Sequence, residues 1–215
     1  IAFLQENYTT STTLGYTNAR DVLYLNIDRI DGQVKCIYSN YSVYLPDTGV
    51  DPSTYLYENG INCEHIWPQR LYEGGGLLKS DMHALRPCKD NINSARNNKP
   101  FNEITDAQTT TWYWQDSQIS NIPSSNIDEY SENHESYFEP REDRKGDIAR
   151  TMFYFYTMYD DVADEDFFEG QKEVLQTWHE QDPANEDGIL RTWKIAEYQE
   201  GKPNPFILDE TLVER

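Results

Sequence analysis

Basic side chains and cysteine are both scarce in this chain of 215 residues. Only 18 residues are Lys or Arg, against 38 Asp or Glu, and the formal net charge is −20. So strong a negative balance argues against a generally basic nucleic-acid-binding surface and against attraction to anionic membranes. The three cysteines, Cys36, Cys63 and Cys88, permit at most one internal disulfide, which excludes a disulfide framework. Which of them pair, if any, stays open.

Long apolar runs are also missing. No stretch approaches the roughly 18 residues of a membrane-spanning helix, so we expect no integral membrane protein. The chain begins at Ile1 without an initiator Met or an apolar leader, which indicates a processed or trimmed domain. Packing material is abundant, with 37% hydrophobic residues, 16 Tyr and 5 Trp, which favours a globular protein over a disordered acidic tail. Because no internal repeat or linker is evident, we expect one α+β domain over residues 1–215.

Hydrophobic spacing predicts the regular elements, and proline, glycine and polar clusters predict the loops between them. The patterns favour helices at 17–30, from 90 to a stop at Pro100, and at 146–159, a strand or hairpin at 33–45 and a short strand at 61–66. Loops are predicted at 46–62, at Gly74–Gly76 and at 115–136.

The charge balance changes sign between Glu64 and Phe101. This window holds six basic side chains and four acidic ones, unlike the rest of the chain. Screening at physiological salt limits the reach of each charge to about 8 Å, so a local positive patch on an acidic body can still bind a polyanion. The window is also where the motifs with chemical potential lie.

The first motif places a carboxylate, Glu64, beside an imidazole, His65. On a regular strand the two side chains would point to opposite faces. A turn at Trp67 and Pro68 would instead let both converge on one substrate group, with Glu64 holding a metal and His65 taking a proton from water. An isolated pair of this kind is also common as a surface ion pair or a packed histidine.

The other two motifs are Asp81–Pro87 and Asn93–Asn98. On a helix, Asn93, Arg96 and Asn97 would share one face. Such a face suits a phosphate with a bound Mg²⁺, because that ion prefers oxygen ligands and keeps several waters. An ordinary polar helix face is the alternative interpretation.

In order, the segments read N-C-E-H-x-W-P, D-M-H-x-L-x-P and N-x-x-R-x-N-x-x-F. This order resembles the bacterial endonuclease I family, which comprises periplasmic and secreted non-specific nucleases with a ββα-metal (His-Me finger) core. The likeness continues through Pro140–Arg141, Gly146–Thr151 and Gly201–Phe206, so it spans Asn62 to Phe206. It implies an α+β fold with the ββα-metal core at about residues 61–101.

The resemblance also implies the parts of a hydrolytic site. His65 would be the general base and Arg96 a second catalytic group, while Glu64 and Asn93 would bind Mg²⁺, for which Ca²⁺ or Mn²⁺ can substitute. The implied activity is hydrolysis of DNA and RNA through phosphate contacts, giving 5′-phosphate ends. The implied protein is monomeric, secreted or periplasmic, and has no membrane partner.

Supporting and substrate-binding residues follow from the same resemblance, with one departure. Asp81, His83 and Asn97 would be supporting residues, and Arg70, Lys79 and Arg86 candidate substrate-binding residues. Several family members have a longer insertion after the Glu-His pair, with a phosphate-contacting Arg and extra cysteines, where this chain has only residues 69–80. Arg70, Lys79 and Arg96 are therefore equal candidates for the role of that Arg.

Two interpretations of other classes stay open. Cys63, His65, His83 and Cys88 include soft ligands that could form a structural zinc site, although their spacing is not that of a zinc finger. Alternatively, the strong negative charge could belong to an inactive nucleic-acid mimic or adhesion module. Metal content and a nuclease assay with and without EDTA would separate these interpretations from the nuclease.

Overall fold

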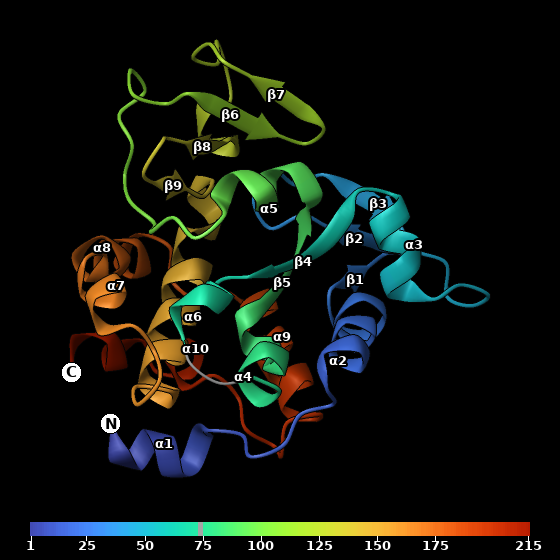
Figure 1. The fold of residues 1–215 in the computed structure, drawn as a ribbon, viewed down its shortest axis with the longest axis vertical. Coiled ribbons are helices and arrows are strands. Elements are labelled where there is room, and N and C mark those ends of the chain that lie inside the picture. The colour runs from blue at the N-terminus through green and yellow to red at the C-terminus, as the bar shows by residue number, and fades with distance from the viewer. Residues whose placement is uncertain (73–74) are drawn as a thin grey trace.

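The computed structural model describes residues 1–72 and 75–215. Its strands form three separate antiparallel sheets (Figure 1). In spatial order they are β1 (Arg29–Ile30), β2 (Gln33–Lys35) and β3 (Ser42–Tyr44); β4 (Ile61–His65) and β5 (Leu85–Lys89); and β7 (Ser117–Ile119), β6 (Thr111–Trp114), β8 (Ser131–Asn133) and β9 (Phe138–Glu139). Each sheet is small, so the helices supply much of the core.

Helices are distributed along the whole chain, before, between and after the strands. They are α1 (Ala2–Tyr8), α2 (Tyr16–Val22), α3 (Pro52–Glu58), α4 (Leu77–Ser80), α5 (Asp90–Arg96), α6 (Lys145–Met158), α7 (Glu165–Glu169), α8 (Lys172–Gln181), α9 (Glu186–Ala196) and α10 (Pro205–Leu208). The mixture of helices and antiparallel sheets confirms the predicted α+β class.

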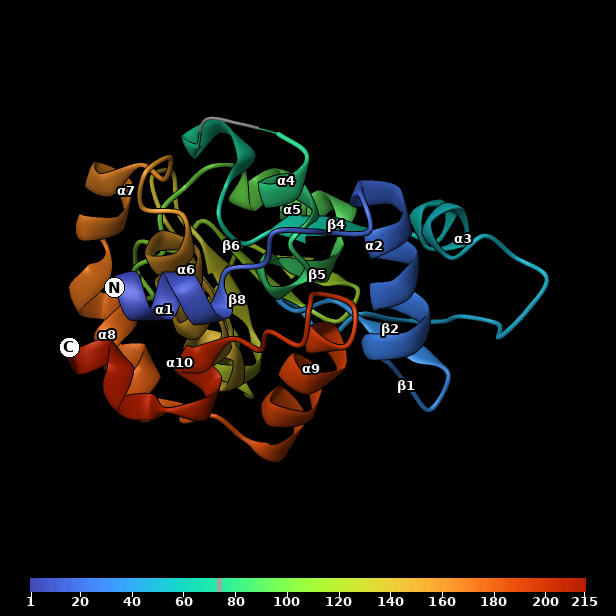
Figure 2. The same ribbon diagram turned by 90° about the horizontal axis from the view of Figure 1, so that it is seen from below.

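The β4–β5 ribbon lies between two hydrophobic clusters. Cys63 and Leu85 belong to one cluster, together with buried residues of α2 and α3. Cys88 belongs to the other, in which α6 packs along α8. Both views show α2 and α3 on one side of the ribbon and α6 and α8 on the other (Figures 1 and 2). The two faces of β4 therefore meet different surroundings, which determines where each polar side chain of the strand can point.

Most of the predicted elements are confirmed. The expected hairpin appears as β2 and β3, the short strand as β4, and the two later helices as α5 and α6. The helix expected at 17–30 is α2 followed by a π-helical turn at Leu23–Ile27, and the chain then enters β1. Gly74, the first glycine of the predicted loop at Gly74–Gly76, lies outside the described residues.

Two loop predictions are wrong in part. The segment 46–62 contains α3, because Pro52 occupies the first turn, where its missing N–H is not needed, and Asp51 caps the helix by accepting from the Thr54 amide at 2.7 Å. The polar segment 115–136 contains β7 and β8, which both pair with the aromatic strand β6. Polar composition concealed both strands: β7 is largely exposed, whereas β8 buries the polar residues Ser131 and Glu132.

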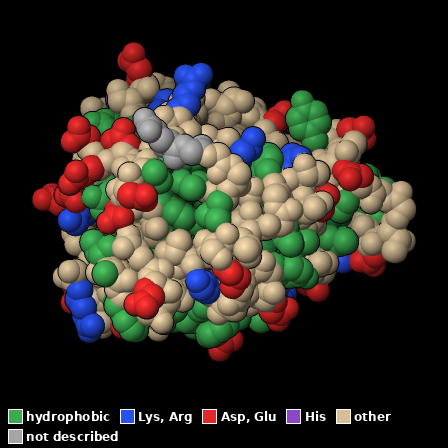
Figure 3. All heavy atoms as spheres, turned by 60° about the horizontal axis from the view of Figure 1, so that its bottom comes forward, with side chains coloured by type: hydrophobic (Ala, Val, Ile, Leu, Met, Phe, Trp, Pro, Cys, Tyr) green, Lys and Arg blue, Asp and Glu red, His purple; other side chains and the backbone are tan. Residues whose placement is uncertain are grey.

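On the face shown in Figure 3, acidic side chains are spread widely rather than gathered in one place, and Lys and Arg occur among them. None of the helices within residues 1–72 and 75–215 combines the length and the apolar character needed to traverse a bilayer.

Candidate active site

Strand β4, strand β5 and helix α5 form one compact unit. β4 pairs antiparallel with β5, with Glu64 opposite Arg86 and His65 opposite Leu85, and α5 begins directly after β5. Asn93 donates from α5 to the Cys63 carbonyl at 3.1 Å, which fixes the helix against the strand. The order strand, strand, helix agrees with the segment in which the sequence predicts a ββα core.

Glu64 is a buried carboxylate at the centre of this unit, and only 2% of the residue is exposed. Its Oε1 accepts a hydrogen bond from the Tyr38 hydroxyl at 2.8 Å and lies 3.3 Å from Nη1 of Arg96. Burial raises the pKa of Glu64 to about 7, although Arg96 and Tyr38 act in the opposite direction. An additional positive charge close to Glu64 would therefore stabilise the ionised form of this buried carboxylate.

Asn93 presents its side chain next to the same face of β4. Its Nδ2 donates to Oδ1 of Asn62 at 2.7 Å and to the Cys63 carbonyl. Asn62 and Glu64 are two positions apart on the strand, so their side chains lie on one face. The Oδ1 atom of Asn93 accepts no hydrogen bond from the described part of the chain, which leaves an amide oxygen close to the carboxylate face.

A hard divalent cation fits this donor chemistry. Mg²⁺ takes carboxylate and amide oxygens and keeps several waters, so one or two protein ligands suffice. Glu64 and Asn93 supply one oxygen donor of each type from adjacent elements. Within residues 1–72 and 75–215, no group of three or more His, Cys, Asp or Glu side chains could hold a metal ion. The candidate metal centre therefore consists of a carboxylate and an amide.

His65 lies on the other face of β4, with its ring stacked on Tyr16 at a centroid distance of 5.3 Å. Nε2 is 3.1 Å from the Lys79 carbonyl oxygen, and Nδ1 is 3.0 Å from Nε2 of Gln69. A carbonyl oxygen can only accept, so Nε2 carries the hydrogen and Nδ1 accepts from the Gln69 amide. Burial lowers the pKa of His65 to about 4, which keeps the ring neutral and leaves Nδ1 as its basic atom.

The predicted convergence of Glu64 and His65 on one group is not observed. β4 stays paired with β5 through His65, so the alternation of the strand places the two side chains on opposite faces. Glu64 contacts Tyr38 and Arg96, whereas His65 contacts Tyr16, Gln69 and Lys79, and no partner is shared. β4 ends at His65, and the next two residues, Ile66 and Trp67, are buried.

The predicted helix face of Asn93, Arg96 and Asn97 is wrong. Helix α5 ends at Arg96, and Asn97 leaves it with a positive φ of 52°. Arg96 is fully buried and donates to the carbonyls of His65 at 3.2 Å and Ile66 at 2.7 Å. The guanidinium group of Arg96 carries five N–H donors in one plane, so it can contact these two carbonyls and Glu64 at the same time. Arg96 therefore positions β4 and Glu64 and does not face a substrate.

Asp81 and His83 form a second buried polar cluster. Oδ1 of Asp81 accepts from the His83 amide at 3.0 Å and from Gln199 at 2.9 Å, and Oδ2 accepts from the hydroxyls of Tyr154 at 2.8 Å and Tyr159 at 2.7 Å. The His83 ring is 2.9 Å from the Lys202 carbonyl, and burial lowers its pKa. These contacts tie the turn before β5 to α6 and to the chain after α9.

The comparison with known families decides the assignment of the chain. The model of the family described as Endonuclease I matches residues 3–210. The chain belongs to the endonuclease I family. This confirms the resemblance drawn from the motifs between Asn62 and Phe206.

Two curated relatives of this endonuclease I family member are both named extracellular ribonuclease. The protein from Bacillus subtilis (strain 168) is 29% identical over 161 residues, which cover 68% of this chain and 50% of the relative. The protein from Bacillus amyloliquefaciens is 28% identical over 211 residues, which cover 83% of this chain and 67% of the relative. The alignment thus spans half to two-thirds of the length of these relatives.

The three candidate substrate-binding residues of the endonuclease I motifs lie in three different places. Arg70 is exposed on a short turn and lines a cavity with Tyr72 and Asp164. Lys79 places its ammonium 4.6 Å from the ring centre of Tyr16, on the side of β4 where His65 lies. Arg86 is buried and lines a separate, larger cavity. Of the three, only Lys79 is near His65.

Sequence reasoning missed the residues that surround the Glu64–His65 pair. Arg20 lies 4.7 Å from the ring centre of Tyr16, so two cations flank the aromatic ring that stacks on His65. Tyr38, the partner of Glu64, comes from the chain before β3. The one available signal was the spacing of Tyr16 and Arg20, which at i and i+4 on a helix are neighbours. Nothing in the sequence placed that helix beside His65.

The structural-zinc interpretation is contradicted. Sγ of Cys88 lies 3.9 Å from Sγ of Cys36, while the ring of His83 is bound to the Lys202 carbonyl. The four predicted ligands are not gathered, since the described residues contain no cluster of this kind. All three cysteines are free and buried, so Cys63 pairs with neither of the others.

Proposed function

We propose that this endonuclease I family member is a metal-dependent nuclease that hydrolyses phosphodiester bonds of DNA and RNA without sequence preference. The observation on which the proposal rests is that the family match over residues 3–210 includes Glu64, His65 and Asn93 in one strand–strand–helix unit. The printed names of the two relatives, extracellular ribonuclease, support nucleic acid as substrate and a secreted or periplasmic location.

In the proposed reaction, His65 is the general base. Its neutral ring and fixed tautomer leave Nδ1 able to take a proton from a water molecule once the exposed Gln69 side chain moves away. The water oxygen forms a bond to phosphorus as the bond from phosphorus to the 3′ oxygen breaks. The departing oxygen takes up a proton, which gives 5′-phosphate and 3′-hydroxyl ends.

Glu64 and Asn93 would hold Mg²⁺, for which Ca²⁺ or Mn²⁺ can substitute. When bound, the ion supplies positive charge that stabilises the charge developing on the phosphate oxygens. Arg96 keeps Glu64 and the end of β4 in place. The scissile phosphate would lie beside Nδ1 of His65, at the end of β4.

Substrate would be held through its phosphates. Lys79 and Arg20, beside Tyr16, provide positive charge next to His65, and phosphate contacts do not read sequence. The activity is then expected to fall as salt is raised, because bound counterions must be released for each phosphate contact. We further propose that the protein acts as a monomer.

The test is cleavage of supercoiled plasmid and of a structured RNA by the purified protein, with Mg²⁺ or with excess EDTA. The expected result is cleavage of both substrates at many sites with Mg²⁺, 5′-phosphate product ends, and none with EDTA. An inactive nucleic-acid mimic or adhesion module would bind without cutting in either condition. Cleavage that persists in EDTA, or that occurs at a single sequence, would contradict the proposal.

A further inference from the structure

The larger cavity, which Arg86 lines, is not lined by Glu64, His65 or Asn93. It measures about 620 Å³ and is enclosed by β1, β2, β5, the start of α6 and the first turns of α9. Although the whole chain carries a net charge of −20, more basic than acidic side chains line this cavity. The basic ones are Arg29, Lys35, Arg86, Arg144, Arg191 and Lys194, and the acidic ones Asp28, Asp31, Asp147 and Asp187.

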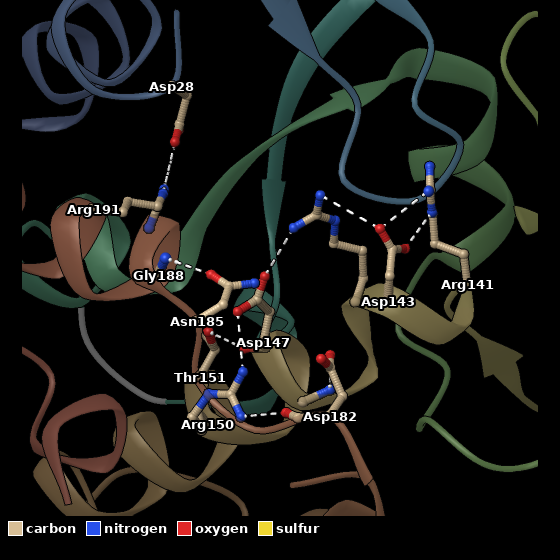
Figure 4. Close-up of polar contacts among 12 residues, drawn as sticks. Asp28, Arg141, Asp143, Asp147, Arg150, Thr151, Asp182, Asn185, Gly188 and Arg191 are labelled. Atoms are coloured by element: carbon tan, nitrogen blue, oxygen red, sulfur yellow. Dashed lines mark hydrogen bonds and ion pairs between the residues drawn. The ribbon is translucent and has the colours of Figure 1, made fainter. Parts of the chain in front are cut away.

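The acids best placed to neutralise the guanidinium groups are already occupied. Asp28 binds Arg191 through both oxygens, at 2.6 and 3.1 Å, and Figure 4 shows this pair facing each other. Asp147 is shared, because Oδ2 lies 3.2 Å from Arg144 and Oδ1 lies 3.2 Å from Arg150. Asp147 lies on α6 and faces Asn185, the residue before α9, with Arg150 beside it (Figure 4).

Arg86 is the exception among these groups. It is only 8% exposed, yet its side chain makes no hydrogen bond and no ion pair with any residue in 1–72 or 75–215, and its Nε is buried without a partner. Burial and the nearby charge of Arg191 lower the pKa of Arg86 to about 10, although the carboxylates of Asp147 and Asp28 act in the opposite direction, so the group is still charged at neutral pH. A charge removed from water without a partner is costly to the fold. Such a group is expected where a ligand supplies the missing anion.

We propose that this cavity binds a phosphate group, with Arg86 as its central ligand and Arg144 and Arg191 on either side. Both of these residues line the same cavity, and their charges act directly on Arg86. Guanidinium groups offer paired donors in one plane, which matches two phosphate oxygens. The volume is sufficient for a phosphate together with an attached nucleoside. The inference does not depend on the proposed hydrolysis.

The test compares phosphate binding by the wild-type protein and by Arg86→Met, with excess EDTA present so that no substrate is cut. Inorganic phosphate is titrated at constant ionic strength, and binding is followed by calorimetry and by the thermal midpoint. The wild-type midpoint is expected to rise with phosphate. In Arg86→Met the affinity is expected to fall about 10- to 100-fold, the effect of losing a charged hydrogen-bonding partner.

A matched control separates the ligand site from a structural arginine. Arg141 is buried to a similar degree but is paired with Asp143 and Glu129, and it does not line the cavity. Without phosphate, Arg86→Met is expected to unfold at the wild-type temperature or above, because an unpaired charge is gone. Arg141→Met is expected to unfold at a lower temperature and still to bind phosphate. An equal response of wild type and Arg86→Met to phosphate would overturn the proposal, as would the absence of any wild-type response.

Two further probes identify the source of the phosphate. A nucleoside 5′-monophosphate represents a free phosphate group, and a single-stranded oligonucleotide without terminal phosphates represents the nucleic-acid backbone. If free phosphate is the ligand, Arg86→Met weakens binding of the monophosphate and leaves the oligonucleotide unaffected. If the backbone is the ligand, the same change weakens binding of the oligonucleotide. If neither probe binds more weakly to Arg86→Met, the site is not a nucleotide or nucleic-acid phosphate site.

Discussion

The buried polar cluster around Asp81 and the one around Glu64 and His65 differ in how many of their hydrogen-bonding atoms have partners. Around Asp81, both carboxylate oxygens accept two hydrogen bonds each, from backbone, amide and phenol donors. Around β4, the contacts of Glu64 with Tyr38 and Arg96 both fall on Oε1, and Nδ1 of His65 meets only an exposed glutamine side chain. Both clusters are buried, so burial alone does not distinguish them.

The difference teaches which buried polar group is structural and which is available for chemistry. A carboxylate whose lone pairs are all occupied by the fold stabilises that fold and has little to offer a ligand. A group with unoccupied atoms at the end of a strand can change partners when substrate arrives. By this criterion the Asp81 region holds the molecule together, and the Glu64–His65–Asn93 region is the one that we propose to carry the chemistry.

The largest effect is expected at His65. General-base assistance is worth roughly 10²- to 10⁴-fold in rate, so His65→Ala should lower nuclease turnover by that factor while the protein stays folded. His179 is the matched control, since it is also buried, its Nε2 lies 2.9 Å from the Glu210 carbonyl oxygen, and it belongs to α8 and not to the β4–α5 unit. His179→Ala should keep near-normal turnover per folded molecule. Equal losses in the two variants would contradict the role of His65 as general base.

The next effect is on stability, at Asp81. Asp81→Ala removes the acceptor of two buried phenols, an amide and a backbone N–H, which should reduce the free energy of unfolding by about 3–5 kcal/mol. Asp81→Asn keeps the shape and one acceptor oxygen and should cost less. Denaturant unfolding measures both. If Asp81→Ala lost turnover but kept its stability, the Asp81 region would belong to the chemistry after all.

A smaller effect is expected from loosening the support of Glu64. Arg96→Lys keeps the positive charge but cannot contact Glu64 and two strand carbonyls together. Residues that orient a metal ligand typically contribute 10- to 100-fold to metal affinity. The Mg²⁺ concentration for half-maximal cleavage should therefore rise by about that factor, with a lesser change in turnover at saturating Mg²⁺. A loss of turnover that saturating Mg²⁺ does not relieve would instead indicate substrate contact by Arg96.

The smallest effect concerns a buried carboxylate with too few donors. Among the described residues, the only hydrogen bond to the Glu132 carboxylate comes from the Thr109 hydroxyl. Burial raises the pKa of Glu132 to about 7. The folded state then holds a proton that the unfolded state has lost, so the stability that this group contributes is lost as pH rises through about 7. Glu132→Gln should stabilise the protein at pH 8 by about 1 kcal/mol and change little at pH 4. Equal effects at both pH values would contradict the raised pKa.

Local patterns predicted the framework of the fold well. The apolar stripe of α6 and the alternation of β2, β3 and β4 lie within single elements, so residues a few positions apart reveal them. Helix α3 was missed because Pro52 was interpreted as a loop signal although it starts a helix. Strand β7 was missed because most of it is exposed, which removes the apolar alternation on which strand prediction depends.

The candidate site was predicted only in part, because its contacts join distant segments. The motifs identified Glu64, His65 and Asn93 as a set. No periodic pattern relates Tyr38 to Glu64, Tyr16 to His65 or Gln199 to Asp81, since each pair forms only when separate elements pack. Strand alternation alone would have predicted that Glu64 and His65 point to opposite faces. The prediction failed because Trp67 and Pro68 suggested a turn that would bring the two side chains together, whereas β4 stays paired with β5 through His65.

The most direct measurement is a titration of Mn²⁺, in place of Mg²⁺, into isotope-labelled protein followed by paramagnetic broadening of its NMR signals. We predict that the signals of Glu64, Asn93 and their neighbours on β4 and α5 broaden first, at substoichiometric metal, and that those of Asn93→Ala do so only at much higher concentration. Broadening that begins at acidic surface residues, with β4 and α5 unaffected, would contradict the assignment of a metal-dependent nuclease site to this unit.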